Sequence, residues 1–89
     1  MSITPQLYIY STEGCHLCDI AVGLLIQLIN PNDIYIELID IAEVDNSDEM
    51  IEQYGERIPV FSSGDKATEL QWPFDINQLA VWLTAEKIV

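Results

Sequence analysis

The sequence predicts an α/β fold, and three observations carry this prediction. Runs of β-branched and aromatic residues alternate with segments of helical period, turn residues separate them, and the resulting order is β-α-β-α-β-β-α. A first β-α-β unit requires parallel strands, whereas the last two strands are joined by a tight turn. We therefore expect a four-stranded mixed sheet flanked by three helices. At 89 residues, the chain is expected to form a single domain, 1–89.

The first half of the chain predicts a strand, a helix and a second strand. The first strand covers Leu7–Tyr10. The helix begins at Cys15 and ends before Pro31, because proline cannot continue a helix. Apolar residues cover most of its surface, so we expect it to be mostly buried. The residues at helical spacing are Leu17, Ile20, Ala21, Leu24, Leu25 and Leu28. Ile34–Ile41 has apolar residues on both faces of its first half, which predicts a strand covered on both sides.

The second half predicts a short helix, a hairpin and a last helix. Ser47 is the expected cap of the short helix, and Gly55 ends it. Arg57–Phe61 is the expected third strand, and Lys66–Leu70 is expected to pair antiparallel with it. Asp75 is the expected N-cap of the last helix. The buried stripe of that helix comprises Ile76, Leu79, Ala80 and Leu83.

The charge is strongly negative. Three Lys and Arg residues stand against fifteen Asp and Glu residues, for a net charge of −12. Nucleic acids and anionic membranes both require clustered basic residues, so we expect neither as a partner. Eight of the fifteen acids lie between Glu37 and Glu56. Such a run is usually a solvated face, and the alternative is an acidic surface that docks a partner.

The cysteine content points to a reducing compartment. Two cysteines are too few for the disulfide framework of a small secreted protein. The first residues carry neither the basic region nor the apolar stretch of a secretory signal. We expect a cytoplasmic protein, in which a close cysteine pair is more often catalytic or metal-binding than a permanent cross-link.

The clearest chemistry lies in Cys15-His16-Leu17-Cys18, where a strand gives way to a helix. The unpaired N–H groups and the dipole at a helix N-terminus lower the pKa of a thiol, whereas Glu13 and the acidic charge act in the opposite direction. Three-residue spacing brings the second sulfur within reach of the first, so Cys18 can attack a mixed disulfide on Cys15. We predict Cys15, nearer the helix start, as the nucleophile and Cys18 as the resolving thiol.

Other interpretations of this segment stay open. A zinc site needs about four ligands, and two cysteines with one histidine require carboxylates or a second copy to complete it. The cysteines are alternatively a buried, inert pair. His16 is a candidate for tuning the thiolate, and an exposed spacer is the alternative.

Further motifs resemble known proteins. Ile58-Pro59 opens the third strand, and together with the Cys-x-x-Cys at the start of the first helix it resembles the thioredoxin superfamily. Tyr10–Cys18, Arg57–Val60 and Trp72–Asp75 are similar to small bacterial glutaredoxin-like proteins of poorly defined function, over essentially the whole chain. The resemblance implies a thioredoxin-like (glutaredoxin-like) fold. It also implies a cis Pro59 beside the two sulfurs, with the backbone of Ile58 binding a thiol substrate.

Three positions depart from the glutaredoxin pattern. Glu13 stands where many glutaredoxins carry a basic residue for a glutathione carboxylate, and His16-Leu17 replaces Pro-Tyr. The Gly-rich, Asp-containing turn that holds the γ-glutamyl group is replaced by Trp72–Asp75, in which only Asp75 could take that role. Its N-cap position explains Asp75 equally well.

Two further side-chain roles have alternatives. Arg57 could meet a substrate carboxylate near Pro59, or form a surface ion pair. Trp72 and Phe74 could form an apolar rim near the sulfurs, or pack onto the core.

These residues together predict a small thiol–disulfide oxidoreductase that reduces or exchanges protein disulfides or glutathione mixed disulfides in cell redox homeostasis. We expect Cys15 and Cys18 to be catalytic, and Ile58, Pro59, Trp72 and Asp75 to bind substrate. We expect no bound cofactor or metal, a thiol reductant with glutathione as a candidate co-substrate, and a monomer. The alternative is a non-catalytic module that docks a partner through its acidic face.

Overall fold

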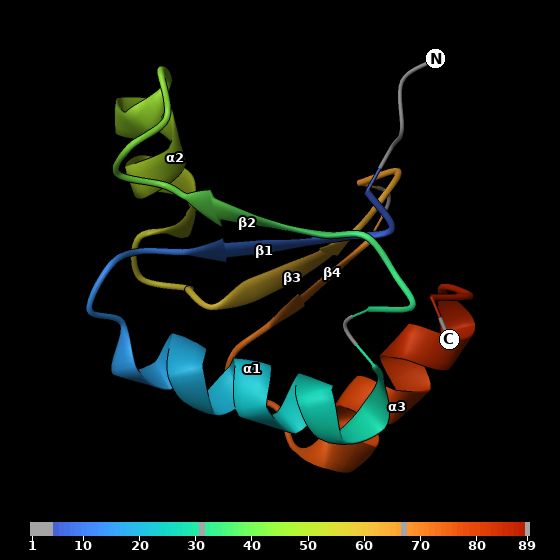
Figure 1. Ribbon diagram of the computed structural model, residues 1–89. Coiled ribbons are helices and arrows are strands. Elements are labelled where there is room, and N and C mark those ends of the chain that lie inside the picture. Colours follow the sequence, from blue (N-terminus) through green and yellow to red (C-terminus); the bar gives the residue numbers. More distant parts are fainter. Residues whose placement is uncertain (1–4, 31, 67, 89) are drawn as a thin grey trace.

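The computed structural model describes residues 5–30, 32–66 and 68–88, and its elements follow the predicted order (Figure 1). They are β1 (Leu7–Ser11), α1 (His16–Leu28), β2 (Ile36–Asp40), α2 (Ser47–Tyr54), β3 (Val60–Ser63), β4 (Glu69–Gln71) and α3 (Ile76–Ala85). The α/β class and the β-α-β-α-β-β-α order are confirmed.

The four strands form one mixed sheet in the order β2-β1-β3-β4. β1 pairs parallel with β2, which confirms the first β-α-β unit. β1 also pairs antiparallel with β3, where Tyr10 lies opposite Val60. β3 pairs antiparallel with β4, as the predicted hairpin requires. β1 and β3 are therefore central, and the chain reaches the start of α1 from the end of a central strand.

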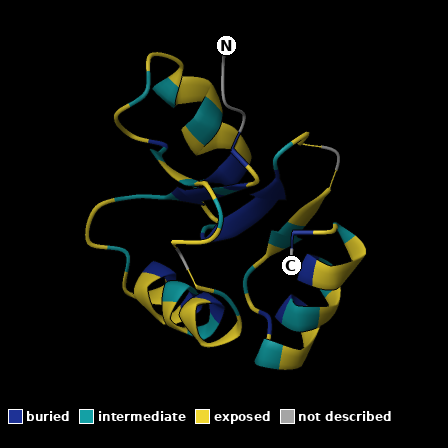
Figure 2. Ribbon diagram, turned by 45° about the vertical axis from the view of Figure 1, so that its right-hand side comes forward, coloured by how far each residue is buried: buried dark blue, intermediate teal, exposed yellow. Residues whose placement is uncertain are grey.

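The helices lie on opposite faces of the sheet (Figure 1). α1 and α3 cover one face, and α2 lies on the other, near the end at which β1 stops. Side chains of β1 alternate between the faces, as a strand requires: Leu7 and Ile9 belong to the α1–α3 core, whereas Tyr10 belongs to a smaller cluster with Tyr54. The larger core comprises Leu7, Ile9, Ala21, Leu25, Phe61, Phe74, Leu79, Leu83 and Ile88. Most of α2 is exposed (Figure 2).

The prediction that α1 is mostly buried is wrong. Its buried residues are Cys18, Ala21 and Leu25. Leu17, Ile20 and Ile26 are 44%, 45% and 54% exposed. The physical reason is that α1 packs against one layer only, so apolar residues on its outer sides meet no second layer.

The prediction that the second strand is covered on both sides is also wrong. β2 is an edge strand, and within the described residues it pairs with β1 alone. Tyr35 and Leu38 are 44% and 65% exposed. The physical reason is that, among the described residues, β2 has a neighbouring strand on one side only, and an open groove between α1 and the α1-side face of β2 leaves Leu38 uncovered.

Several element boundaries differ from prediction. α2 has Asn46 rather than Ser47 at its N-cap, and that side chain makes no capping hydrogen bond. β3 begins at Val60, not Arg57, because the N–H groups of Arg57 and Ile58 both donate to the carbonyl of Tyr54 and continue the turn after α2. β4 covers Glu69–Gln71 rather than Lys66–Leu70, since Lys66 has a positive φ of 60° and belongs to the hairpin turn.

The N-cap prediction for α3 is confirmed. The Asp75 carboxylate accepts from the N–H of Gln78 at 2.7 Å, and the Gln78 side chain accepts from the N–H of Asp75 at 2.8 Å. This reciprocal pair is a capping box, which satisfies two N–H groups that the helix leaves unpaired.

Replacing Asp75 by alanine should therefore lower the free energy of unfolding by about 1 kcal/mol, because one N–H loses its acceptor. Urea denaturation measures the change. Asp75→Asn keeps a capping oxygen and serves as the control, which should lose less than Asp75→Ala. Equal stability of Asp75→Ala and the wild type would contradict the structural role of this carboxylate.

Candidate active site

The two cysteines form a disulfide at the start of α1. Cys15 and Cys18 are bonded, with their Cα atoms 5.2 Å apart. Cys15 is the N-cap, in extended conformation, and its N–H donates to the carbonyl of Thr12 at 3.2 Å. Gly14 has a φ of +77°, a left-handed conformation that glycine adopts without strain. The turn from β1 thus delivers Cys15 to the helix N-terminus, as the sequence predicts.

The two sulfur positions are not equivalent. Cys18 is 5% exposed, whereas Cys15 is partly exposed. The N–H of Cys18 donates to Cys15 Sγ at 3.2 Å, so the first sulfur receives a hydrogen bond from the first turn of the helix. The interpretation as two buried cysteines does not fit Cys15. Cys15 is thus the more exposed of the two cysteines.

Glu13 and His16 flank Cys15 and are both exposed. Within the described residues, the structure gives the His16 side chain no hydrogen-bond or ion-pair partner. This arrangement fits the spacer interpretation, and thiolate tuning by His16 stays a prediction.

Pro59 lies at the same end of the sheet as the disulfide. Since Tyr10 pairs with Val60, the residue before β3 lies beside the end of β1, from which the cysteine turn starts. The Ile58-Pro59 bond is cis, as the resemblance implies, and Pro59 is buried. The carbonyl of Pro59 accepts from the N–H of Trp72 at 3.1 Å. The structure thus brings three of the predicted binding residues close to the end of β1.

The loop before α3 packs onto the core. Phe74 is 6% exposed, and its ring centroid lies 5.2 Å from that of Phe61. Trp72 meets Phe74 edge to face, also at 5.2 Å, and remains partly exposed. Core packing is therefore the confirmed interpretation for Phe74. The Trp72-Pro73 bond is also cis, which the sequence analysis did not anticipate.

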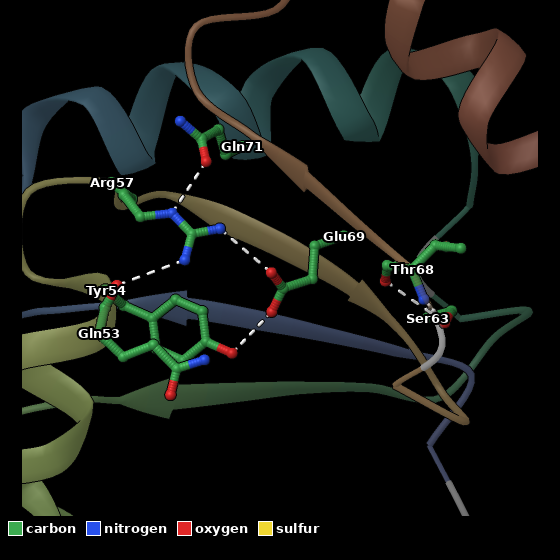
Figure 3. A network of polar contacts seen from close by, with 7 residues as sticks. All are labelled: Gln53, Tyr54, Arg57, Ser63, Thr68, Glu69 and Gln71. Carbon is green, nitrogen blue, oxygen red and sulfur yellow. Dashed lines mark hydrogen bonds and ion pairs between the residues drawn. The ribbon is translucent and has the colours of Figure 1, made fainter.

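Arg57 is held in place by three hydrogen bonds to other residues of the chain (Figure 3). Its Nε donates to Gln71 at 2.8 Å, its Nη1 to the carbonyl of Gln53 at 3.3 Å, and its Nη2 to Glu69 at 3.1 Å. The guanidinium also lies 5.2 Å from the centre of the Tyr54 ring. The predicted surface ion pair is confirmed, with Glu69 as its acid.

Tyr54 completes this network and fastens α2 to the sheet. Its hydroxyl donates to Glu69 at 2.6 Å (Figure 3), and its ring stacks on Tyr10 with centroids 4.5 Å apart. Burial raises the pKa of Tyr54 above its usual range, and the Glu69 carboxylate raises it further. Through Tyr54 and Arg57, the segment between α2 and Pro59 is thereby attached to both β1 and β4. Sequence reasoning missed this network because its partners lie 12 to 15 residues apart on separate elements.

Across the described residues, no group of three or more His, Cys, Asp and Glu side chains is arranged to hold a metal ion. No helix within the same residues has the length and apolar character needed to cross a membrane.

The comparisons with known proteins agree with this geometry. The fold is similar to that of a solved structure, thioredoxin O2 from Arabidopsis thaliana in its oxidized state. It aligns with a TM-score of 0.61 over 92% of this chain and 74% of its own, at 16% identity. The model of the Glutaredoxin-like domain (DUF836) matches residues 6–84. The chain belongs to this glutaredoxin-like family.

Two further solved structures are similar over nearly their full lengths. The target protein XcR50 from X. campestris is 35% identical, with a TM-score of 0.72 over 89% of this chain and 96% of that one. Protein Ne2328 from Nitrosomonas europaea is 25% identical, with a TM-score of 0.64 over 92% and 94%. No curated protein matches the chain. The predicted thioredoxin-like, glutaredoxin-like fold is confirmed, and the close cysteine pair indicates a redox function.

The Tyr54–Glu69 contact predicts a pH-dependent stability. A raised pKa in the fold means that the stabilisation is fully present below the ordinary value of 10.0 and is lost as the pH rises through and above it. At pH 8, Tyr54→Phe should lower the free energy of unfolding by about 1 kcal/mol, because a hydrogen bond is lost. By pH 11, the free energy of unfolding of the wild type should fall by about 1.4 kcal/mol relative to that of Tyr54→Phe, since the unfolded tyrosine ionises, so Tyr54→Phe should then be at least as stable as the wild type.

Urea denaturation of the oxidised protein at both pH values measures this difference. Tyr35→Phe removes an exposed tyrosine and is the matched control for the loss of one phenol. A wild-type advantage over Tyr54→Phe that is the same at pH 8 and pH 11 would contradict the prediction.

Proposed function

We propose that this protein is a small thiol–disulfide oxidoreductase that reduces or exchanges disulfides through Cys15 and Cys18. The observation that carries the proposal is the asymmetry of the pair: Cys15 is partly exposed at the helix N-terminus and accepts an N–H, whereas Cys18 is buried behind it. Membership of the glutaredoxin-like family supports it.

The reaction follows from these positions. In the reduced protein, the Cys15 thiolate attacks one sulfur of a substrate disulfide. A bond forms between that sulfur and Cys15 Sγ, the substrate disulfide breaks, and the departing thiolate takes a proton from solvent. Cys18, after losing its proton to solvent, then attacks Cys15 Sγ and releases the second substrate thiol. Two electrons have passed to the substrate, and the chain is left with the Cys15–Cys18 disulfide.

A second thiol couple must return two electrons to complete the cycle. We propose a thiol reductant, either glutathione or a dithiol protein, as a co-substrate and no bound cofactor. A reducing compartment such as the cytoplasm would supply it. Run in reverse, the same exchange oxidises a partner dithiol, and the reduction potential relative to the partner decides the direction.

The residues proposed to receive the substrate are Ile58, Pro59, Trp72 and Asp75. The backbone of Ile58, beside Pro59, is proposed to hydrogen-bond the substrate chain next to its sulfur, and Trp72 to offer an apolar contact. In this proposal the Asp75 carboxylate keeps its N-cap hydrogen bond through Oδ1 and contacts the substrate with the rest of its exposed side chain. His16 is proposed to influence the thiolate through its charge state.

The first experiment is equilibration of the purified protein in a series of glutathione redox buffers. Thiols are trapped at each step and the species are read by intact mass. Reversible titration of an internal disulfide, or of a glutathione adduct on Cys15, would support a redox-active pair. Two free thiols throughout would overturn it and favour a binding module, for which the exposed and acidic α2 offers the docking face.

Replacing Cys15 by serine should abolish turnover of a disulfide substrate, because the attacking sulfur is lost. The fold should remain, since Cys15 is a surface N-cap and serine is a good capping residue. Circular dichroism checks the fold, and a disulfide-reduction assay checks the activity. Turnover that survives in Cys15→Ser would remove the mechanism.

The matched variant is Cys18→Ser, which should retain the first attack and lose the second. The protein should then accumulate as a mixed disulfide with the substrate on Cys15, visible as an added mass. If the adduct instead forms on Cys18 in Cys15→Ser, the assignment of the two cysteines is reversed.

A further inference from the structure

An apolar groove leads from the disulfide along α1 and β2. Its first part has a volume of about 430 Å³ and is lined by both Cys15 and Cys18. Its second part, of about 440 Å³, continues toward the start of β2. Val22, Ile26 and Leu38 line both parts, so the two parts are adjacent. Both parts lie on the side of α1 toward the edge strand, away from Pro59 and Trp72.

The α1–β2 groove is lined by large apolar side chains that are exposed to solvent. Ile26 is 54% exposed and Leu38 is 65% exposed. Edge strands usually carry charged side chains that discourage unwanted contacts, yet β2 presents a leucine into the groove. Contiguous exposed apolar surface next to a reactive pair indicates a binding surface.

The charge at the disulfide end of the groove is negative. Glu13 and Asp19 line the first part, and both are exposed. Among the residues that the structure describes, neither part is lined by a lysine or an arginine. Arg57 is engaged by Glu69, and the Lys66 ammonium lies 4.9 Å from the centre of the Tyr8 ring. A ligand with several carboxylates would thus meet repulsion here and no compensating cation.

We propose, on the basis of the proposed function, that the substrate is a disulfide in a polypeptide segment that is apolar next to its cysteine and carries lysine or arginine. The apolar residues lie in the α1–β2 groove against Val22, Ile26 and Leu38. The basic side chain lies near Glu13 and Asp19, where opposite charge steers its approach. Glutathione, with two carboxylates, is by this argument the poorer substrate.

The charge of the whole chain decides against a second copy as the occupant. Each copy carries a net charge of −12, so two copies repel each other as their surfaces approach. A basic partner instead gains from the same field, and the gain weakens as salt screens it.

The test compares two synthetic cysteine peptides with the same apolar residues, one flanked by lysines and one by glutamates. Each is joined through its cysteine to the same chromogenic thiol, and bis(2-hydroxyethyl) disulfide is the small neutral reference. At low ionic strength, kcat/KM should be roughly fivefold or more higher for the lysine peptide than for the glutamate peptide, because two exposed ion pairs, to Glu13 and Asp19, stabilise its binding. The preference should decline in high salt, and in the double variant Glu13→Gln, Asp19→Asn.

The groove itself is tested with the double variant Ile26→Ser, Leu38→Ser. The ratio of kcat/KM for the lysine peptide to that for the small reference should fall roughly fivefold, because two apolar contacts are lost. Val81→Ser is the matched control, since Val81 is 70% exposed on α3 and lies outside the groove. It should leave the ratio unchanged. Circular dichroism confirms that each variant is folded.

The outcomes separate the two proposals. No turnover of either peptide or of the small reference by the wild type would overturn the proposed function, and the substrate class with it. Turnover of the reference with equal kcat/KM for both peptides would overturn the substrate class alone. The substrate class alone would also be overturned if the Ile26→Ser, Leu38→Ser variant kept the wild-type ratio of kcat/KM for the lysine peptide to that for the small reference. A stable dimer in sedimentation that Leu38→Ser dissociates would overturn it as well.

Discussion

The candidate site depends on one constraint, the abrupt turn by which the central strand β1 passes into α1. Gly14 adopts the left-handed conformation that this turn requires, and Cys15 becomes the N-cap. At that position its sulfur accepts an N–H that the helix cannot satisfy internally, while the first turn of the helix places Cys18 behind it. The same geometry that ends the strand therefore makes one sulfur accessible and buries the other. The exposure of the two cysteines and the hydrogen bond to Cys15 both follow from where the helix begins.

The opposite wall of the site is built by contacts between elements far apart in the chain. Tyr54 stacks on Tyr10 and donates to Glu69, and Arg57 bridges from the end of α2 to β4. These contacts hold the turn before Pro59 and, at the same time, occupy the only arginine. A cation that would otherwise suit a substrate carboxylate is thus used for structure. The charged side chains that line the hollow at the cysteines are therefore acidic, Glu13 and Asp19, although the N-terminus of α1 itself carries a positive partial charge.

The sequence predicted what local rules determine. Strand and helix periods, the Asp75 N-cap and the cysteine spacing all depend on neighbours within one or two turns, and each is found in the structure. The Tyr54–Glu69 and Arg57–Gln71 contacts depend on the register of β3 and β4, which no local pattern specifies. The roles of Ile58 and Trp72 toward a substrate stay predictions, because their geometry toward a bound chain depends on a partner.

The two largest errors of the sequence analysis occur on the same surface. The apolar residues of α1 and β2 predicted burial on more than one side, since hydrophobic residues normally mark contact with another layer. In the fold, Ile26 and Leu38 instead line an open groove and remain exposed. A pattern that indicates burial, at a place where the chain supplies no layer to cover it, is the pattern expected of a surface whose second layer belongs to another molecule. On a chain with a net charge of −12, that molecule is best matched by an apolar segment with positive charge.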